Sequence, residues 1–164
     1  MVWGSSAGIY GDAATVAHMV DEALPDGGSY AQMKRRSEDQ VLEAGGTVLR
    51  LSNILGYRDR DVSVIGDILR QLDEDGPLRV HRLTPIRDYL ALNDAADAIV
   101  RATLGATRGC FNLGSGQSRS VGDVVATFLS VAGQTDRDVE ETRASSAPSI
   151  LRLDITGTIE ALQW

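Results

Sequence analysis

Short runs of β-favouring residues alternate along the chain with stretches whose apolar residues recur every three or four positions. The first kind predicts strands, and the second predicts helices that pack by one face. Strands are expected at 2–3, 47–52, 78–83, 88–92 and 109–113, with a further extended segment at 138–143. Helices are expected at 29–44, from about 63, from 93, from 120 and at 155–164. Because the two kinds alternate throughout, the sequence predicts a layered α/β domain.

Local signals place several element boundaries. Gly4-Ser5-Ser6 is expected to end the first strand, and Gly45-Gly46 to stop helix 29–44. Ser120-Val-Gly-Asp123 fits a capping box at the start of a helix. Asn93 is expected to cap another helix, whose packing face would carry Ala96, Ile99, Val100 and Thr103.

The chain begins inside a predicted strand, since Val2 and Trp3 follow Met1 with no cap or polar lead. The ends of independent domains usually lie free at the surface. Two interpretations stay open on this observation. Either the strand belongs beside an N-terminal partner that the chain lacks, or it is a short edge strand.

Composition limits the class of protein. The chain has 164 residues, 43% hydrophobic and 24% charged, with a formal net charge of −7 and a pI near 4.7. These values fit one domain with a substantial core. The acidic balance argues against a nucleic-acid partner. No apolar run reaches the ~18–20 residues of a membrane span, and no signal-peptide pattern is present, so the expected location is the cytoplasm.

Metal and disulfide chemistry find little support in the sequence. Cys110 is the single cysteine, which excludes an internal disulfide and a cysteine cluster for zinc. His18 and His81 lie far apart without matching ligands, so no metal site is expected. Asp73-Glu-Asp-Gly76 lacks the later acidic ligand of a calcium loop and is expected to be a solvated turn.

Tyr30 and Lys34 lie four positions apart in helix 29–44, so their side chains share one face. A nearby ammonium favours the phenolate form of a tyrosine, which can then move protons to and from a carbonyl or hydroxyl. Taken alone, the pair is weak evidence and fits an ordinary exposed helix face better than a catalytic site.

A hydroxyl-rich turn, Ser5-Ser6-Ala-Gly-Ile-Tyr10-Gly11, follows the first strand. Ligands of open parallel sheets bind outside the carboxyl ends of the strands. A hydroxyl at this position can therefore hydrogen-bond a reacting oxygen. The alternative is a plain turn of small residues.

The order of the motifs is more specific than any one of them. After the turn at 5–11, the chain carries five further motifs in a fixed order. They are Tyr30-Ala-Gln-Met-Lys34, residues 49–56, Ile86-Arg-Asp-Tyr-Leu90, Asp94-Ala-Ala-Asp97, and residues 111–116, which lead into 120–124. This succession resembles the extended short-chain dehydrogenase/reductase family, and within it the NAD-dependent sugar-nucleotide epimerases of the UDP-glucose 4-epimerase type. The resemblance covers nearly the whole chain but only the C-terminal half of the family's pattern, because the first strand and its Gly-x-x-Gly-x-x-Gly turn are absent.

The resemblance implies a fold as well. The chain would form the C-terminal portion of a Rossmann-type parallel sheet plus a small α/β substrate-binding lobe, in one truncated unit. Residues 1–56 would be the remnant of the dinucleotide-binding sheet, and 57–164 mainly the lobe, with some segments returning to the sheet. A hydrophobic sheet edge would be exposed. Gly114-Ser-Gly116 lacks a third glycine and is interpreted as a turn.

The same resemblance implies catalytic roles for three residues. Ser6 would orient the substrate oxygen, and Tyr30 would be the acid/base that moves a proton during hydride exchange. Lys34 would support Tyr30 and bind the nicotinamide ribose. The implied cofactor is NAD or NADP, which this chain by itself is expected to bind poorly.

Four further residues are implied in binding a sugar-nucleotide substrate. Asn53 would contact the sugar nucleotide, and Arg87 and Arg143 would hold its diphosphate or ribose through bidentate guanidinium groups. Ser63, near a helix start, would add an anion contact.

The implied reaction is 4-epimerisation through a transient 4-keto sugar, with 4-keto reduction as the alternative within the class. Dehydratases of the family carry an Asp-Glu pair where this chain has Ala7 and Gly8, which disfavours dehydration. The alternative from another class is a truncated, non-catalytic relative that only binds a sugar nucleotide or a partner chain. Family members often dimerise through two helices, so a homodimer is a candidate assembly in which helix 29–44 would be one of the two helices, while the other would lie in the half that is absent.

Overall fold

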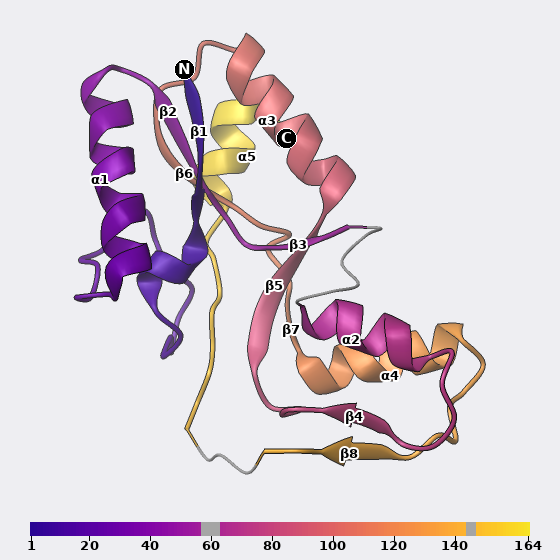
Figure 1. Cartoon of the computed structure of the whole chain (residues 1–164). Helices are drawn as coiled ribbons and strands as arrows, with labels where there is room; N and C mark the ends of the chain where they lie inside the picture. Colours follow the sequence, from indigo (N-terminus) through magenta and orange to yellow (C-terminus); the bar gives the residue numbers. More distant parts are fainter. Residues whose placement is uncertain (57–62, 144–146) are drawn as a thin grey trace.

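The computed structural model describes residues 1–56, 63–143 and 147–164. Its first sheet has three parallel strands in the order β1-β2-β6, namely β1 (Val2–Ser6), β2 (Thr47–Leu51) and β6 (Gly109–Leu113) (Figure 1). Val2 lies opposite Thr47, and Thr47 lies opposite Gly109. The carboxyl ends of the three strands therefore meet at one edge, where ligands of such sheets bind.

Helices cover both faces of this sheet. α1 (Ser29–Glu43) lies on one face, and α3 (Leu92–Leu104) and α5 (Thr156–Leu162) lie on the other (Figure 1). Alternation along β2 explains this arrangement, because neighbouring side chains of a strand point to opposite faces. Leu49 packs in an apolar cluster with residues of α3 and α5, whereas Arg50 faces Glu38 of α1.

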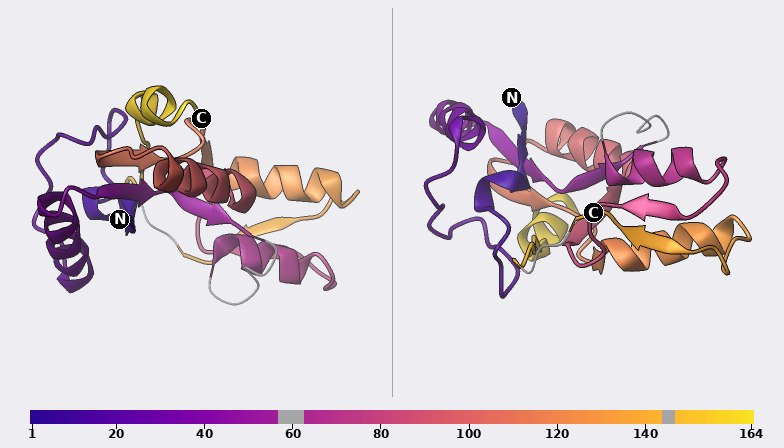
Figure 2. Two further views of the ribbon diagram at one scale, coloured as in Figure 1. Left: turned by 90° about the horizontal axis from the view of Figure 1, so that it is seen from above. Right: turned by 60° about the horizontal axis from the view of Figure 1, so that its bottom comes forward.

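A second lobe consists of short strands and two helices (Figure 2). β5 (Ile86–Ala91) lies between the parallel β3 (Asn53–Leu55) and the antiparallel β7 (Ser118–Ser120). β4 (Leu78–Val80) pairs in parallel with β8 (Val139–Glu141). The helices α2 (Val64–Gln71) and α4 (Val121–Val131) pack on the lobe's own core, which includes Ile68, Leu78 and Val125.

One segment ties the lobe to the loop behind β1. Ile150 bridges both Ala13 and Ile86 of β5, and Leu153 bridges His18. Leu153 also belongs to an apolar cluster with residues of the short 3₁₀ helix η1 (Ala7–Tyr10). The segment 150–153 therefore contacts both the loop that follows β1 and strand β5 of the lobe.

Most of the predicted elements are confirmed. Helix 29–44, strand 47–52, the helix from about 63 and the strand at 109–113 are all present within a residue or two. The capping box of α4 is confirmed, because the Ser120 side chain accepts from the Asp123 amide at 3.0 Å and the Asp123 carboxylate accepts from the Ser120 amide at 3.0 Å.

Two strand boundaries were predicted wrongly. Gly4-Ser5-Ser6 does not end the first strand but continues it, since Gly4, Ser5 and Ser6 pair in register with 49–51 of β2. Pairing with a buried neighbour overrides the turn tendency of these small residues. The strand expected at 78–83 stops at Val80, where its pairing with β8 ends.

The start and the packing face of α3 were also predicted wrongly. The helix begins at Leu92, and its N-cap, Ala91, makes no side-chain capping bond, so Asn93 is not the cap. Its buried residues are Ala95, Ala98 and Ala102, whereas the predicted face with Ile99 and Val100 is exposed. Alanines let the helix approach the sheet closely, which a search for large apolar residues does not detect.

Candidate active site

The carboxyl end of β1 carries Ser6, the predicted catalytic serine. Ser6 is the last residue of the strand, and its Oγ accepts a hydrogen bond from the Gly8 amide at 3.1 Å, which caps η1. A Cβ on Gly8 would lie 3.2 Å from Ser6 Oγ, so glycine keeps this hydroxyl uncrowded. Ser6 lines a cavity of about 330 Å³ together with Asn53 and Arg87.

Tyr30 and Lys34 lie on α1, which packs its N-terminal end on η1. Ala31, next to Tyr30, is buried in the same apolar cluster as Ala7, which follows Ser6. Lys34 Nζ donates to the Gly4 carbonyl of β1 at 3.2 Å and lies 5.8 Å from the centroid of the Tyr30 ring. Tyr30 itself is 53% exposed. The structure therefore brings Lys34 to both the serine strand and the Tyr30 ring.

The four predicted substrate-binding residues line one cavity of about 420 Å³ between β5, α2 and the end of β8. Asn53, Ser63, Arg87 and Arg143 all belong to its wall. Ser63 is the N-cap of α2 and accepts from the Gly66 amide at 3.1 Å. Residues from four distant parts of the sequence thus converge on one space, and His81 and Arg82 line it as well.

Asn53 and Arg87 line this substrate cavity and also the cavity at Ser6, so the two spaces share part of their walls. Arg87 is not a free cation, however. Its Nη1 donates to the carbonyls of Ile86 and Ser149 at 2.8 Å, and its Nη2 donates to Ser149 Oγ at 2.7 Å and to Asp12 Oδ2 at 3.2 Å. Both Nη atoms therefore already donate hydrogen bonds to Ser149. A sequence pattern does not reveal this contact.

Two hydroxyl groups of these cavities are not predicted from the sequence. Tyr89 Oη and Ser52 Oγ are buried and find no hydrogen-bond partner among the described residues. Tyr89 lines the substrate cavity, and Ser52 lines the cavity at Ser6. Burial raises the pKa of the Tyr89 phenol, although the charge of Arg87 opposes the shift, so the phenol is held as a hydrogen-bond donor. The sequence signal that could have identified them is their position, because Ser52 precedes Asn53 and Tyr89 lies two positions after Arg87.

Asp88 explains the Gly114-Ser-Gly116 turn. The Asp88 carboxylate accepts from the Ser115 amide at 2.7 Å, from Ser115 Oγ at 2.9 Å and from the Gly116 amide at 2.9 Å. A Cβ on Gly114 would lie 2.8 Å from Asp88 Oδ2, so only glycine fits. The amides of this turn are thus engaged by a carboxylate and cannot bind a phosphate, which confirms its interpretation as a structural turn.

Within 1–56, 63–143 and 147–164, no group of three or more His, Cys, Asp or Glu side chains could hold a metal ion. Over the same residues, no helix is both long and apolar enough to cross a bilayer.

Comparisons with known proteins identify the family of the chain. Residues 1–114 match the profile of the NAD dependent epimerase/dehydratase family. The match covers more than half of the chain, and the chain belongs to this family. Its members and its structural neighbours are NAD(P)-dependent sugar-nucleotide epimerases, dehydratases and dehydrogenases, so the chain is related to enzymes that modify sugar nucleotides.

Among curated proteins, dTDP-6-deoxy-L-talose 4-dehydrogenase (NAD(P)(+)) of Kitasatospora kifunensis is 28% identical, over 82% of this chain and 48% of the relative. The chain therefore spans about half the length of that relative.

Solved structures share the fold. RMD from Pseudomonas aeruginosa, complexed with NADPH, superposes with a TM-score of 0.89 at 21% identity and covers 99% of this chain and 60% of that one. dTDP-glucose 4,6-dehydratase from Bacillus anthracis, in complex with NAD, gives 0.87 at 19% identity, with 99% and 55% covered. UDP-glucose 4-epimerase from Thermotoga maritima, with UDP-glucose, gives 0.83 at 22%, with 99% and 57% covered. The Rossmann-type fold is thereby confirmed.

The described residues fit one end of an NAD(P) cofactor. Tyr30 and Lys34 offer a phenol and an ammonium at the edge of β1, where a nicotinamide ribose is expected. In the glycine-rich turn 114–116, the amides of Ser115 and Gly116 are already occupied by Asp88. Among the described residues, Tyr30 and Lys34 are therefore the ones that would contact the nicotinamide end of a bound cofactor.

Proposed function

We propose that this chain is the catalytic and substrate-binding half of an NAD-dependent sugar-nucleotide 4-epimerase. The observation that carries the proposal is the convergence of Asn53, Ser63, Arg87 and Arg143 on one cavity that adjoins the cavity of Ser6. A sugar diphosphate nucleotide is long enough to occupy both spaces, with the nucleotide in the larger cavity and the hexose beside Ser6.

In this proposal the residues of β1 and α1 handle the proton. Tyr30 takes the proton of the sugar's 4-hydroxyl while Ser6 hydrogen-bonds the same oxygen, and Lys34 stabilises the phenolate that Tyr30 needs at the start. A nicotinamide cofactor held at Tyr30 and Lys34 would supply the hydride acceptor and donor for C4. Rotation of the 4-keto sugar within the pocket exposes its other face, and Tyr30 then returns the proton.

Binding energy in this proposal comes from the lobe. Arg143 supplies a cation at the rim of the larger cavity, Ser63 adds a hydroxyl at the start of α2, and Asn53 reaches both cavities. The hydroxyls of Ser52 and Tyr89, which lack partners among the described residues, would gain them from the ligand. Satisfying buried donors of this kind favours a ligand rich in oxygen atoms.

A second candidate is 4-keto reduction of a nucleotide-linked deoxysugar, supported by the name of the curated relative, a 4-dehydrogenase. The same three residues would serve, with a single hydride transfer instead of two. The third candidate is a non-catalytic relative that binds a sugar nucleotide or a partner chain. Intact Ser6, Tyr30 and Lys34 favour the two enzymes over this binder.

Isothermal titration of the 164-residue chain tests the proposal. We expect UDP-glucose or dTDP-glucose to bind, and Arg143→Ala to weaken binding at least about tenfold, since a hydrogen bond to a charged group contributes about 1.5–3 kcal/mol. Arg79→Ala, an exposed arginine of neighbouring β4 paired with Glu140, is the matched control and should bind normally. An Arg143→Ala chain that binds as tightly as the parent would contradict the assigned cavity.

The cofactor is titrated in the same experiment. We expect NAD to bind no tighter than about millimolar, which corresponds to roughly −4 kcal/mol. Tighter binding would mean that the chain builds a cofactor site without the family's first glycine turn. Sugar-nucleotide turnover in the presence of the matching cofactor then separates the candidates: an interconverted 4-epimer indicates the epimerase, and net reduction of a 4-keto sugar indicates the reductase.

A further inference from the structure

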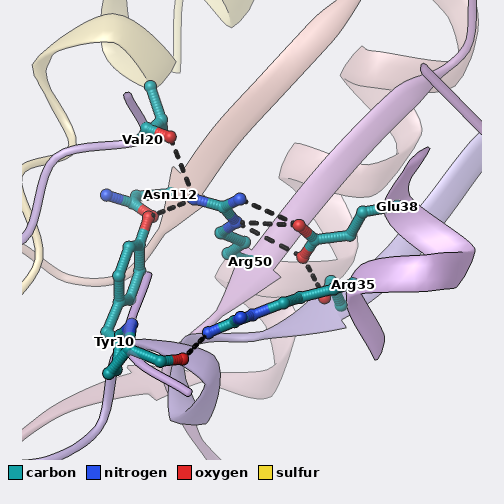
Figure 3. A network of polar contacts seen from close by, with 8 residues as sticks. Tyr10, Val20, Arg35, Glu38, Arg50 and Asn112 are labelled. Atoms are coloured by element: carbon teal, nitrogen blue, oxygen red, sulfur yellow. Dashed lines mark hydrogen bonds and ion pairs between the residues drawn. The ribbon is translucent and has the colours of Figure 1, made fainter. Parts of the chain in front are cut away.

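A buried polar network lies between α1 and the sheet (Figure 3). Glu38 is 2% exposed and Arg50 is 6% exposed. Arg50 Nη2 donates to Glu38 Oε2 at 2.8 Å, and Arg50 Nε lies 3.2 Å and 3.3 Å from the two carboxylate oxygens. This two-pronged contact fixes the carboxylate and the guanidinium in one plane, which a packed apolar pair would not do.

The network extends to three more parts of the fold. Ser5 Oγ of β1 donates to Glu38 Oε1. Arg50 Nη1 donates to Tyr10 Oη at 2.8 Å and to the Val20 carbonyl at 3.0 Å, and Tyr10 in turn donates to Asn112 Oδ1 of β6 at 2.7 Å. Burial raises the pKa of Tyr10 to about 12 against the opposing hydrogen bond from Arg50, so Tyr10 stays a donor.

The charge of Arg50 is stable in this position. Burial alone lowers the pKa of Arg50, but its hydrogen bonds to Glu38 and Tyr10 outweigh burial and raise it. The guanidinium therefore remains charged at any working pH, and its contacts to α1, η1 and the loop at Val20 persist together.

The network lies directly beside the proposed catalytic residues. Tyr30, Lys34 and Glu38 are spaced by four along α1 and so share a face. On β1, Lys34 contacts the Gly4 carbonyl, and Glu38 contacts the neighbouring Ser5, which immediately precedes Ser6. Lys34 Nζ also lies 5.4 Å from the centroid of the Trp3 ring.

We infer that Glu38 and Arg50 are positioning residues, which hold the face of α1 that carries Tyr30 and Lys34 against the strand that ends in Ser6. Ser5 is the hydrogen-bonded link between this pair and β1. The inference rests on the proposed function for its catalytic meaning, but its structural content can be measured without turnover.

Lys34 is a specific chemical probe of the contact between α1 and β1, because it is the single lysine of the chain. Its ammonium is held by the Gly4 carbonyl and the Trp3 ring, and release from them makes the amine more reactive. The rate of acetylation of Lys34 by acetic anhydride, measured by peptide mass spectrometry relative to the N-terminal amine, therefore reports how α1 lies on β1. Trp3 fluorescence in a Trp164→Phe background gives a second report.

The variants are Glu38→Gln, Arg50→Lys and Ser5→Ala. Ser5→Ala removes the link to β1 but leaves the ion pair, so it remains informative if Glu38→Gln fails to fold. Asp88→Asn is the matched control, because it also removes a buried and hydrogen-bonded carboxylate, in the lobe away from α1. All rates are compared under conditions where each variant is fully folded by circular dichroism.

We expect Lys34 acetylation to rise at least threefold in Glu38→Gln and Arg50→Lys, and about twofold in Ser5→Ala, with a red shift of Trp3 emission. Asp88→Asn should leave both signals at parental values although it lowers stability. Unchanged Lys34 reactivity in folded Ser5→Ala and Glu38→Gln would overturn the inference and leave the pair a general stabiliser. Because the parent chain's affinity for a sugar nucleotide is measured separately, failure of the proposed function would not be confused with this result.

Discussion

At the scale of single residues, the molecule places charges in its interior only where each has several partners. Asp88 is 2% exposed and accepts three hydrogen bonds from the turn at Ser115 and Gly116. An unpaired buried carboxylate would be very costly, so the amides of the turn and the carboxylate depend on one another. Asp88 belongs to β5 of the lobe, and the turn follows β6 of the first sheet. The carboxylate therefore connects the lobe to the sheet.

Replacing Gly114 tests this dependence. The added methyl of Gly114→Ala would lie 2.8 Å from Asp88 Oδ2 and would push the carboxylate from its donors. We expect the free energy of unfolding to fall by about 1–3 kcal/mol, the usual cost of overpacking. Urea denaturation measures the change. Gly157→Ala is the control, since a Cβ there meets nothing within 4 Å, and it should leave stability within about 0.5 kcal/mol of the parent.

At the scale of elements, the sequence predicted what local chemistry determines. Helix 29–44, with Tyr30 and Lys34 on one face, and the capping box at Ser120 could be predicted because each depends on residues a few positions apart. The start and packed face of α3 could not, because the packed face depends on how closely the helix approaches a sheet built from distant strands.

The candidate site, too, could be predicted from the sequence only in part. Asn53, Ser63, Arg87 and Arg143 were identified from a resemblance of motifs, and the structure places all four on one cavity. The sequence did not reveal that Arg87 already binds Ser149 and Asp12. It also did not reveal that the hydroxyls of Tyr89 and Ser52 lack partners among the described residues. These facts arise from contacts between residues far apart along the chain, for which a single sequence carries no signal.

The capping box of α4 predicts a pH dependence of stability. The hydrogen bonds from the Ser120 side chain and backbone lower the pKa of Asp123. A lowered folded-state pKa contributes stability that is present above the unfolded value of about 3.9 and is lost as pH falls through the folded value. Ser120→Ala should lose about 1 kcal/mol at pH 7, the typical cost of an N-cap.

Denaturation of the parent and Ser120→Ala at several pH values between 7 and 2.5 measures both effects. The difference between the two chains should shrink as the solution becomes acidic, because the parent loses the interaction that the variant lacks. Ser130→Ala, in the last turn of the same helix and outside the capping box, should differ from the parent by a constant amount. A Ser120→Ala difference that stays constant down to pH 2.5 would contradict the role of the Asp123 charge.

At the scale of the whole molecule, α3 is apolar on two sides. Ala95, Ala98 and Ala102 pack on the sheet, while Leu92, Val100 and Leu104 are 52%, 52% and 81% exposed at a spacing of four or eight positions. Among the described strands, β1 pairs only with β2, so its other edge is open. Apolar side chains are therefore exposed on a helix face, in addition to the open strand edge.

This surface predicts self-association of the chain in solution. Contiguous exposed apolar patches drive association, whereas single exposed residues do not. We expect the apparent mass in analytical ultracentrifugation to rise with protein concentration, and Val100→Glu/Leu104→Glu to reduce that rise and the binding of a hydrophobic dye. The circular dichroism spectrum should be unchanged, because neither side chain packs in the core. Val131→Glu, at the end of α4 and 85% exposed, is the control and should associate like the parent. If the double variant associates as strongly as the parent, the open edge of β1 and not the face of α3 is the surface through which the chain self-associates.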